Sequence, residues 1–305
     1  MSEKLFYKTS ELVDTWVDLT LRDKEGSYLT GIEEFDKEFD YSLRGKFIAL
    51  IGKGGSGKSM FGLQVSTGNS VGKDDNDKSC GIFMNGEMSN NNLLDRVFDF
   101  QFGEIHQEKK RASKHFKDSL TEGNANSYKK QLKDQLNDFY KDSLLITNSS
   151  DLIEIGKGIR ELQNKKKNIV GLVIDSSSMM DSKGDSKESA EYYSKGFKKI
   201  ANTYNICVLV IYHTPKSVPS DKRDLSEESK DSVTVFNNAD AMISFSSILD
   251  EDGRKINDLK YLQLFAKRIT GGYVDKVCRV NTSHLVLEPT NIPPESFPER
   301  EVKGF

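Results

Sequence analysis

Residues 52–59 read Gly52-Lys53-Gly54-Gly55-Ser56-Gly57-Lys58-Ser59, which fits the phosphate-binding pattern GxxxxGK[ST]. The apolar run 47–51 precedes this stretch, and a helical pattern that begins at Met60 follows it. In such a turn the backbone N–H groups converge on phosphates, and the helix N-terminus adds partial positive charge. We therefore expect residues 52–60 to bind ATP, with Lys58 on the outer phosphates and Ser59 on Mg²⁺. An ordinary glycine-rich turn with a helix cap is the alternative.

The composition suits one large α/β domain, because 36% of the 305 residues are hydrophobic. The 44 basic and 47 acidic residues nearly balance, so net charge neither indicates nor excludes a nucleic-acid partner. Cys80, Cys207 and Cys278 lie in apolar runs, without metal-binding spacing or a recognisable secretory leader. They predict buried thiols in a cytoplasmic protein. No apolar stretch approaches the roughly 20 residues that span a bilayer, so no membrane contact is expected.

Short apolar runs alternate with polar or helix-patterned stretches along the chain. Apolar residues at three- and four-residue steps predict a crossover helix over residues 187–204. This alternation is typical of βαβ units and predicts an α/β fold with a mostly parallel sheet, covered by helices on both faces. The runs expected to form strands are 47–51, 80–84, 144–146, 169–174, 206–212, 241–245 and 262–266.

The remaining stretches suggest how the chain is divided. Residues 9–22 predict an amphipathic helix that packs either on its own domain or on a neighbouring subunit. The lysine-rich stretch 103–142 also contains many acidic residues. We therefore interpret it as solvated helices, and the alternative is a surface that binds nucleic acid. Prolines crowd residues 288–305 and predict an extended or disordered tail able to dock on a partner. The expected divisions are thus 1–27, 28–287 and 288–305.

Three polar residues that follow predicted strands complete a candidate catalytic set. Asp175 ends a buried run, where a carboxylate suits the water shell of Mg²⁺. Glu87 is the candidate general base for the water that attacks the γ-phosphate. His213 is a candidate sensor of that phosphate. The alternatives are a strand-capping Asp, a helix-capping Glu and a histidine with satisfied hydrogen bonds.

The order and spacing of these motifs resemble the motor domain of DnaB-like hexameric replicative helicases, within the superfamily 4 RecA-like P-loop ATPases. The resemblance spans roughly residues 28 to 287 and implies a RecA-like core with a C-terminal β-hairpin region. The matching stretches are Thr30-Gly31-Ile32-Glu33-Glu34-Phe35-Asp36, the phosphate loop, Gly86-Glu87-Met88 with Arg96, Val173-Ile174-Asp175, His213-Thr214-Pro215-Lys216, Phe236-Asn237-Asn238-Ala239-Asp240-Ala241 and Ala266-Lys267-Arg268-Ile269-Thr270-Gly271-Gly272.

The resemblance implies a ring, usually a hexamer, in which ATP lies between subunits. Glu87 then activates water, and Lys267 or Arg268 of the next protomer stabilises the transition-state charge. The family usually separates these two cations by one residue, whereas here they are adjacent, so either one can be the trans finger. A surface salt bridge made by Arg268 is the alternative.

The resemblance also implies that the loops 176–189 and 214–231 line a channel for single-stranded DNA. Acidic residues are interspersed in both loops, so ordinary solvated loops are the alternative. Lysine and arginine side chains in these loops can neutralise phosphates. The candidate contacts are Lys183, Lys187, Lys216, Lys222 and Arg223.

The expected function is therefore an ATP-dependent DNA helicase of replication. About 28 residues stand before the expected motor domain, so we expect a compact form without a collar domain, similar to phage or plasmid helicases. Two other functions remain open: a RecA-like recombinase or mediator that forms filaments on DNA, and a nucleotide-switched regulatory ATPase without nucleic acid. The C-terminal tail is the candidate docking site for a replication-protein partner.

Overall fold

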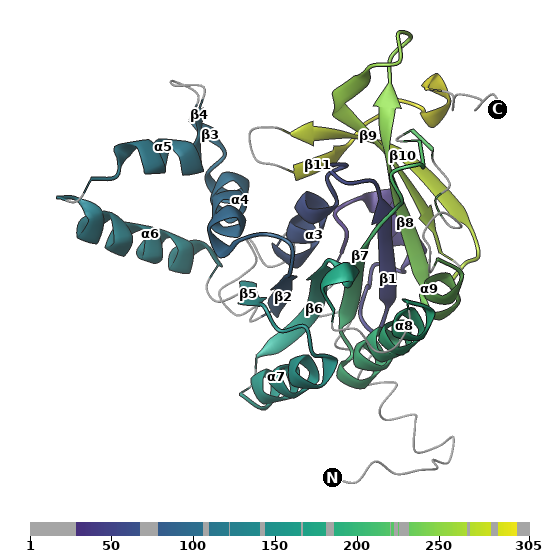
Figure 1. The fold of residues 1–305 in the computed structure, drawn as a ribbon, viewed down its shortest axis with the longest axis horizontal. Helices are drawn as coiled ribbons and strands as arrows, with labels where there is room; N and C mark the ends of the chain where they lie inside the picture. Colours follow the sequence, from purple (N-terminus) through teal and green to yellow (C-terminus); the bar gives the residue numbers. More distant parts are fainter. Residues whose placement is uncertain are drawn as a thin grey trace.

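A nine-stranded mixed sheet forms the centre of the molecule (Figure 1). The computed structural model describes residues 29–67, 79–105, 110–121, 123–140, 144–165, 167–180, 186–219, 221–222, 225, 232–266, 269–281 and 286–297. The strands of the central sheet are β1 (Phe47–Gly52), β2 (Ser79–Asn85), β5 (Leu144–Thr147), β6 (Asn168–Asp175), β7 (Cys207–His213), β8 (Ala241–Leu249), β9 (Lys255–Phe265), β10 (Tyr273–Asn281) and β11 (Val286–Pro289).

The spatial order of the strands is β11-β10-β9-β8-β1-β7-β6-β2-β5. The strands from β8 through β5 pair in parallel, whereas β9, β10 and β11 join one edge in antiparallel pairs. Every apolar run predicted as a strand lies in this sheet, so the mostly parallel architecture and the C-terminal hairpin region are confirmed. β1 lies between β7 and β8, which puts the phosphate loop near the middle of the carboxyl edge.

Helices cover both faces of the sheet. The predicted crossover helix 187–204 is confirmed as α8. The helices are α2 (Glu33–Glu38), α3 (Lys58–Thr67), α4 (Asn90–Phe102), α5 (Ala112–Ser119), α6 (Ala125–Tyr140), α7 (Leu152–Asn164), α8 (Ser186–Tyr204) and α9 (Ser232–Asn238), with short 3₁₀ turns at Ser177–Met179 and Pro294–Ser296. In the described part of the chain, no helix is both long and apolar enough to cross a membrane.

The alternating side chains of β1 supply two separate cores. Leu50 belongs to the core on the α3 face, together with Phe61. Phe47 belongs to the core on the opposite face, where its ring centroid lies 5.7 Å from that of Phe197 on α8. Burial of such a side chain stabilises the fold by about 1.5–3 kcal/mol, so both faces hold β1 in place.

Helix α3 is packed against the sheet without spare room. A Cβ atom on Gly81 of β2 would lie 2.2 Å from the Ser66 carbonyl oxygen of α3. On the helix side, a Cβ atom on Gly62 would lie 2.9 Å from Cγ1 of Val173 on β6. The helix that begins at the phosphate loop is therefore seated directly on β2 and β6.

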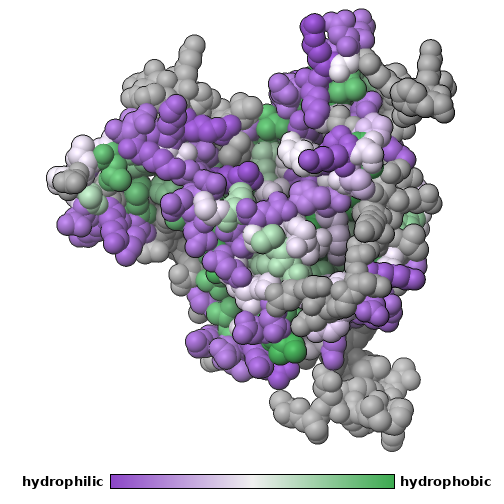
Figure 2. Space-filling view, in the orientation of Figure 1, coloured by the Kyte–Doolittle hydropathy of each residue, from purple (hydrophilic) through white to green (hydrophobic). Residues whose placement is uncertain are grey.

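Helices α4, α5 and α6 project from the sheet as an arm (Figure 1). Within the arm, Asp99 joins α4 to α5, because its Oδ1 accepts a hydrogen bond of 3.0 Å from the N–H of Ser113. Phe98 packs against Phe102 and Phe116. Hydrophobic side chains show at the surface of the arm among hydrophilic ones (Figure 2). The helices expected within 103–142 are present, together with a short pair, β3 (Glu104–Ile105) and β4 (Lys110–Arg111), that the sequence did not predict.

The end of the chain is more structured than the expected tail. The strand β11 includes Glu288 and Pro289. Gln64 of α3 binds β11 through both backbone groups of Leu287, accepting from the N–H at 2.7 Å and donating to the carbonyl at 3.1 Å. Phe297 is partly buried and packs against the core near Val277 of its own chain. Residues 1–27 and the last part of the tail lie outside the described residues.

Candidate active site

The phosphate loop joins β1 to α3 in a conformation that its glycines permit. Gly55 and Gly57 have φ angles of 74° and 108°, a region that side chains disfavour. At Gly54 and Gly55 an added Cβ would meet no atom within 4 Å, so the mouth of the loop is open. The Ser56 hydroxyl is buried without a hydrogen-bond partner among the described residues, and Met60 lies in the first turn of α3. This is a cradle with room and donors for phosphates.

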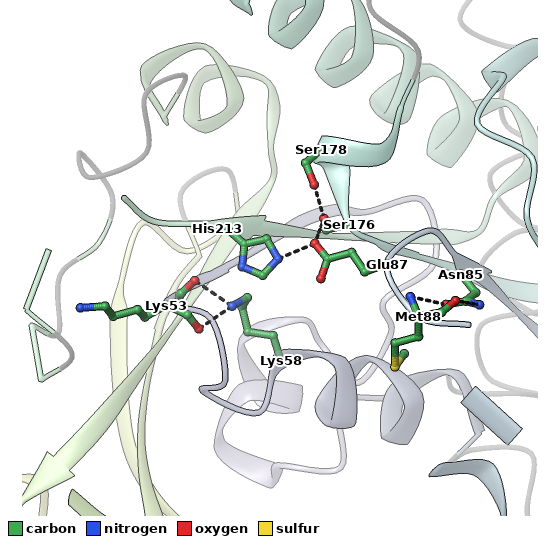
Figure 3. A network of polar contacts seen from close by, with 9 residues as sticks. Lys53, Lys58, Asn85, Glu87, Met88, Ser176, Ser178 and His213 are labelled. Carbon is green, nitrogen blue, oxygen red and sulfur yellow. Dashed lines mark hydrogen bonds and ion pairs between the residues drawn. The ribbon is translucent and has the colours of Figure 1, made fainter. Parts of the chain in front are cut away.

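Lys58 is buried and points back into the loop (Figure 3). Its ammonium donates to the carbonyl oxygens of Gly52 at 2.7 Å and Lys53 at 2.8 Å. Burial lowers the pKa of Lys58 to about 8, while the charges of Asp175 and Glu87 oppose that shift. A phosphate brought to this loop would therefore stabilise a cation that the apolar surroundings disfavour.

Glu87 lies just beyond β2, and hydrogen bonds connect it to two other strand ends (Figure 3). Its Oε1 lies 2.7 Å from Nε2 of His213 and also accepts from the Ser176 hydroxyl, which lies 2.7 Å from that of Ser178. Although desolvation acts to raise it, the pKa of Glu87 is held below its ordinary value by Ser176, His213 and the charge of Lys58. Glu87 is thus kept ionised and able to accept a proton from water.

Asp175 ends β6 beside this group and is fully buried. Neither of its carboxylate oxygens makes a hydrogen bond to the described residues. Burial raises the pKa of Asp175, and the nearby Ser59 hydroxyl opposes the rise without completing a hydrogen bond of good geometry. A buried carboxylate with free lone pairs next to a P-loop serine fits a metal-bound water, so these residues suit Mg²⁺.

His213 is the last residue of β7 and pairs in register with Gly52. The next residue, Thr214, donates its N–H to the Gly52 carbonyl at 3.3 Å. The strand that carries the candidate sensor therefore runs directly alongside the phosphate loop. The structure brings together five of the residues that the sequence singled out, namely Lys58, Ser59, Glu87, Asp175 and His213.

The predicted trans finger and DNA contacts are placed only in part. Lys216 is exposed after β7, and Lys187 is exposed in the first turn of α8, which starts within the expected loop 176–189. Lys183, Arg223, Lys267 and Arg268 lie outside the described residues. The flanking residues Phe265 and Tyr273 lie at the amino end of β1, because Phe265 pairs with Met242 and Met242 with Ala49. The connection between β9 and β10 thus starts and ends away from the chain's own phosphate loop.

Sequence reasoning missed Ser176 and Ser178. Ser176 directly follows Asp175, but only the folded sheet brings its hydroxyl to a glutamate 89 positions earlier in the sequence. The sequence shows only that Ser176 follows the candidate metal-side acid Asp175, and this position does not indicate a contact with Glu87.

Residues 28–258 match the model of the DnaB-like helicase C terminal domain. The chain belongs to that family. No curated protein matches the chain by sequence. This DnaB-like chain is similar in structure to a solved ATPase domain, with a TM-score of 0.67, 15% identity, and coverage of 92% of this chain and 99% of that one.

Two further solved structures share the fold. One is titled "The Structure Of A DnaB-Like Replicative Helicase And Its Interactions With Primase"; its TM-score is 0.66 at 16% identity, covering 94% of this chain and 68% of that one. The RadB recombinase has a TM-score of 0.52 at 13% identity, covering 87% of this chain and all (100%) of that one. At these identities the similarities establish the RecA-like fold of the DnaB-like chain and nothing finer.

Proposed function

We propose that this DnaB-like domain hydrolyses ATP at the seam between identical subunits of a ring and uses the energy to move along single-stranded DNA. The proposal rests on the group of side chains at the carboxyl edge of the sheet. Glu87 is hydrogen-bonded to His213, the Lys58 ammonium is hydrogen-bonded to a carbonyl of the phosphate loop, and Asp175 lies beside Ser59 without a hydrogen-bond partner among the described residues. These are the functions that phosphoryl transfer to water requires, namely a base, a phosphate cation and a metal-side acid.

In this proposal each residue has one role. The N–H groups of the phosphate loop bind the phosphates, and Lys58 moves its hydrogen bonds from main-chain carbonyls to phosphate oxygens. Glu87 takes a proton from the attacking water while His213 and Ser176 hold its carboxylate in position. Ser59 and Asp175 are the residues that would hold Mg²⁺, which would supply positive charge to neutralise the phosphates.

The position of the β9–β10 connection supports a site shared between subunits. Its flanking residues Phe265 and Tyr273 lie at the opposite end of β1 from the phosphate loop, so we expect a cation in this connection to act on a neighbour's ATP and not on its own. An arginine supplied in trans typically accelerates such reactions by about 10³–10⁵-fold. Closing a ring gives every subunit both halves of a site.

The loop after His213 supports the assignment of single-stranded DNA. The loop starts directly after His213, and Lys216, three positions later, is exposed. Loss of the γ-phosphate contact at His213 would therefore act close to a candidate DNA contact. Six repetitions of such a loop around a channel would follow the phosphate backbone without reading its sequence.

ATP turnover with and without single-stranded DNA, together with the native mass of the ATP-bound assembly, tests this function. We expect DNA to stimulate turnover and the assembly to be a closed ring, hexameric by mass. Filaments on DNA would favour a recombinase instead. A monomer whose turnover ignores DNA would contradict both and leave a regulatory ATPase.

A further inference from the structure

The loop after β7 lies docked on the sheet in its described residues, which are 214–219, 221–222 and 225. The side chains of Val218 and Leu225 are only 5% and 3% exposed and belong to the core on the α8 face. The Ser246 hydroxyl donates to the Lys222 carbonyl. Leu225 also lines a small hollow with Ile51 and Met242. The proposed DNA loop therefore has a defined resting position beside β1.

Lys53 joins this loop to the phosphate loop. Its ammonium donates to the Val218 carbonyl at 3.0 Å, 165 positions away in the sequence. Its own carbonyl accepts the bond of 2.8 Å from Lys58. In Figure 3 the Lys53 ammonium points away from Lys58, while the carbonyl turns toward it. One residue thus contacts the phosphate-binding cation through its main chain and the candidate DNA loop through its side chain.

A bound triphosphate would act on both contacts. Phosphate oxygens draw the Lys58 ammonium from the carbonyls of Gly52 and Lys53, which frees the main chain of Lys53 to move. They also compete for the Lys53 ammonium, because an anionic oxygen adds the attraction between opposite charges to the hydrogen bond, which a neutral carbonyl does not. The Val218 carbonyl is neutral, so it loses this competition when the phosphates are within reach.

We propose that Lys53 is a positioning residue that holds the loop 214–219 in its resting position and releases it when a nucleoside triphosphate fills the phosphate loop. This inference rests on the proposed ATP site and adds a second connection to the loop besides His213. Leu225 and Lys222 keep their own anchors on the sheet, and the Val218 side chain stays in the core, so the release is confined to the first half of the loop, before Val218. Lys216 lies in the released half.

A fluorescent probe on Ser217→Cys tests the release without DNA. Ser217 is exposed, whereas Cys80, Cys207 and Cys278 are buried, so a thiol-reactive dye would label the new cysteine selectively. We expect Mg-ATPγS to change the emission of the probe in the otherwise unaltered protein. The same probe in Lys53→Met should already show the released emission without nucleotide, and its response to Mg-ATPγS should shrink at least about fivefold.

Two controls isolate the contact. Lys53→Arg keeps a cation that can reach the Val218 carbonyl and should restore the resting emission. Lys157→Met removes an exposed lysine of α7 and should leave the probe emission unchanged, both without nucleotide and with Mg-ATPγS. Because the nucleotide-free emission of Lys53→Met is read on its own, weakened nucleotide binding cannot hide the result. The inference is overturned if Lys53→Met has the resting emission before nucleotide is added.

The failure of this inference can be told apart from the failure of the proposed function. If the probe responds to Mg-ATPγS and to Lys53→Met as expected but DNA does not stimulate ATP turnover, the role of Lys53 is supported and the translocase function is contradicted. If DNA stimulates ATP turnover but Lys53→Met does not change the emission of the probe, the translocase function is supported and the role of Lys53 is contradicted.

Discussion

The Oε1 atom of Glu87 lies 2.7 Å from Nε2 of His213, which connects the candidate base to the residue before the candidate DNA loop. A change at the γ-phosphate can thus reach β7 through one hydrogen bond. The pair also lies beside the buried end of β6, because the Gly86 N–H donates to the Asp175 carbonyl at 2.8 Å. Three strand ends therefore meet at the candidate catalytic group.

Glu87→Gln should keep nucleotide affinity and reduce kcat by roughly 10²–10⁴-fold, since the amide keeps the shape but cannot take the proton. Binding of a fluorescent ATP analogue and steady-state turnover measure the two quantities. Glu161→Gln, an exposed change on α7, is the matched control and should leave both alone. Near-normal turnover in Glu87→Gln would mean that another group is the base.

Ser176→Ala should shift the acidic limb of the kcat–pH profile to higher pH. The Ser176 hydroxyl helps to hold the pKa of Glu87 below its ordinary value, although desolvation opposes it. Without that hydroxyl the pKa rises, so Glu87 becomes protonated at a higher pH as the solution is acidified. Ser178→Ala, which acts only through Ser176, should cause a smaller shift. If the unaltered protein, Ser176→Ala and Ser178→Ala have the same acidic limb, Ser176 does not lower the pKa of Glu87.

Nucleotide affinity should fall as the pH rises through about 8, because burial lowers the pKa of Lys58 to about 8 in the free protein. Above that pH the phosphates must first recruit a proton to Lys58, so binding takes up protons. Titration calorimetry in buffers of different ionisation enthalpy measures this uptake. Lys58→Arg should bind more weakly but lose the pH dependence, since guanidinium does not titrate in this range.

Asp175→Asn should raise the Mg²⁺ concentration needed for half-maximal turnover by about 10–100-fold, as expected for the loss of a group that orients metal-bound water. The buried carboxylate has no other partner in the described chain, so the change breaks no hydrogen bond of the fold. Asp252→Asn, on the exposed β8–β9 turn, is the control. An unaltered Mg²⁺ requirement would place the metal-side acid elsewhere.

Arg268→Ala should lower turnover of the assembly by about 10³-fold if this residue is the trans finger. Mixing it with Glu87→Gln creates seams in which an intact Glu87 faces an intact Arg268, so turnover should partly return. Lys267→Ala, treated in the same way, shows which of the adjacent cations acts. If no mixture regains activity, the site is completed within one subunit.

Local patterns made the fold readable from the sequence. The run 47–51 before the glycines predicts β1, and the helical spacing of Phe197 and Ile200 predicts α8, because each pattern is complete within a few residues. The same local reading found Asp175, Glu87 and His213, since carboxyl ends of parallel strands meet at one edge.

Contacts between distant parts of the chain could not be read in this way. Nothing near Ser176 indicates its bond to Glu87, and nothing near Lys53 indicates Val218, because both contacts depend on how whole strands are ordered. Phe297 shows the same limit. Nothing near this residue of the proline-rich tail indicates its contact with the core near Val277, which depends on the folded hairpin.

The close seating of α3 on Gly81 and Val173 has a practical meaning for engineering. A helix with no clearance for a methyl group at these two positions has little room to tilt or slide, so we expect it to stay fixed on the sheet if the loops at the carboxyl edge move. Under the proposed function, substitutions that raise thermal stability should be tolerated in α3 and its contacts, whereas rigidifying substitutions in the loop after His213 should lower turnover.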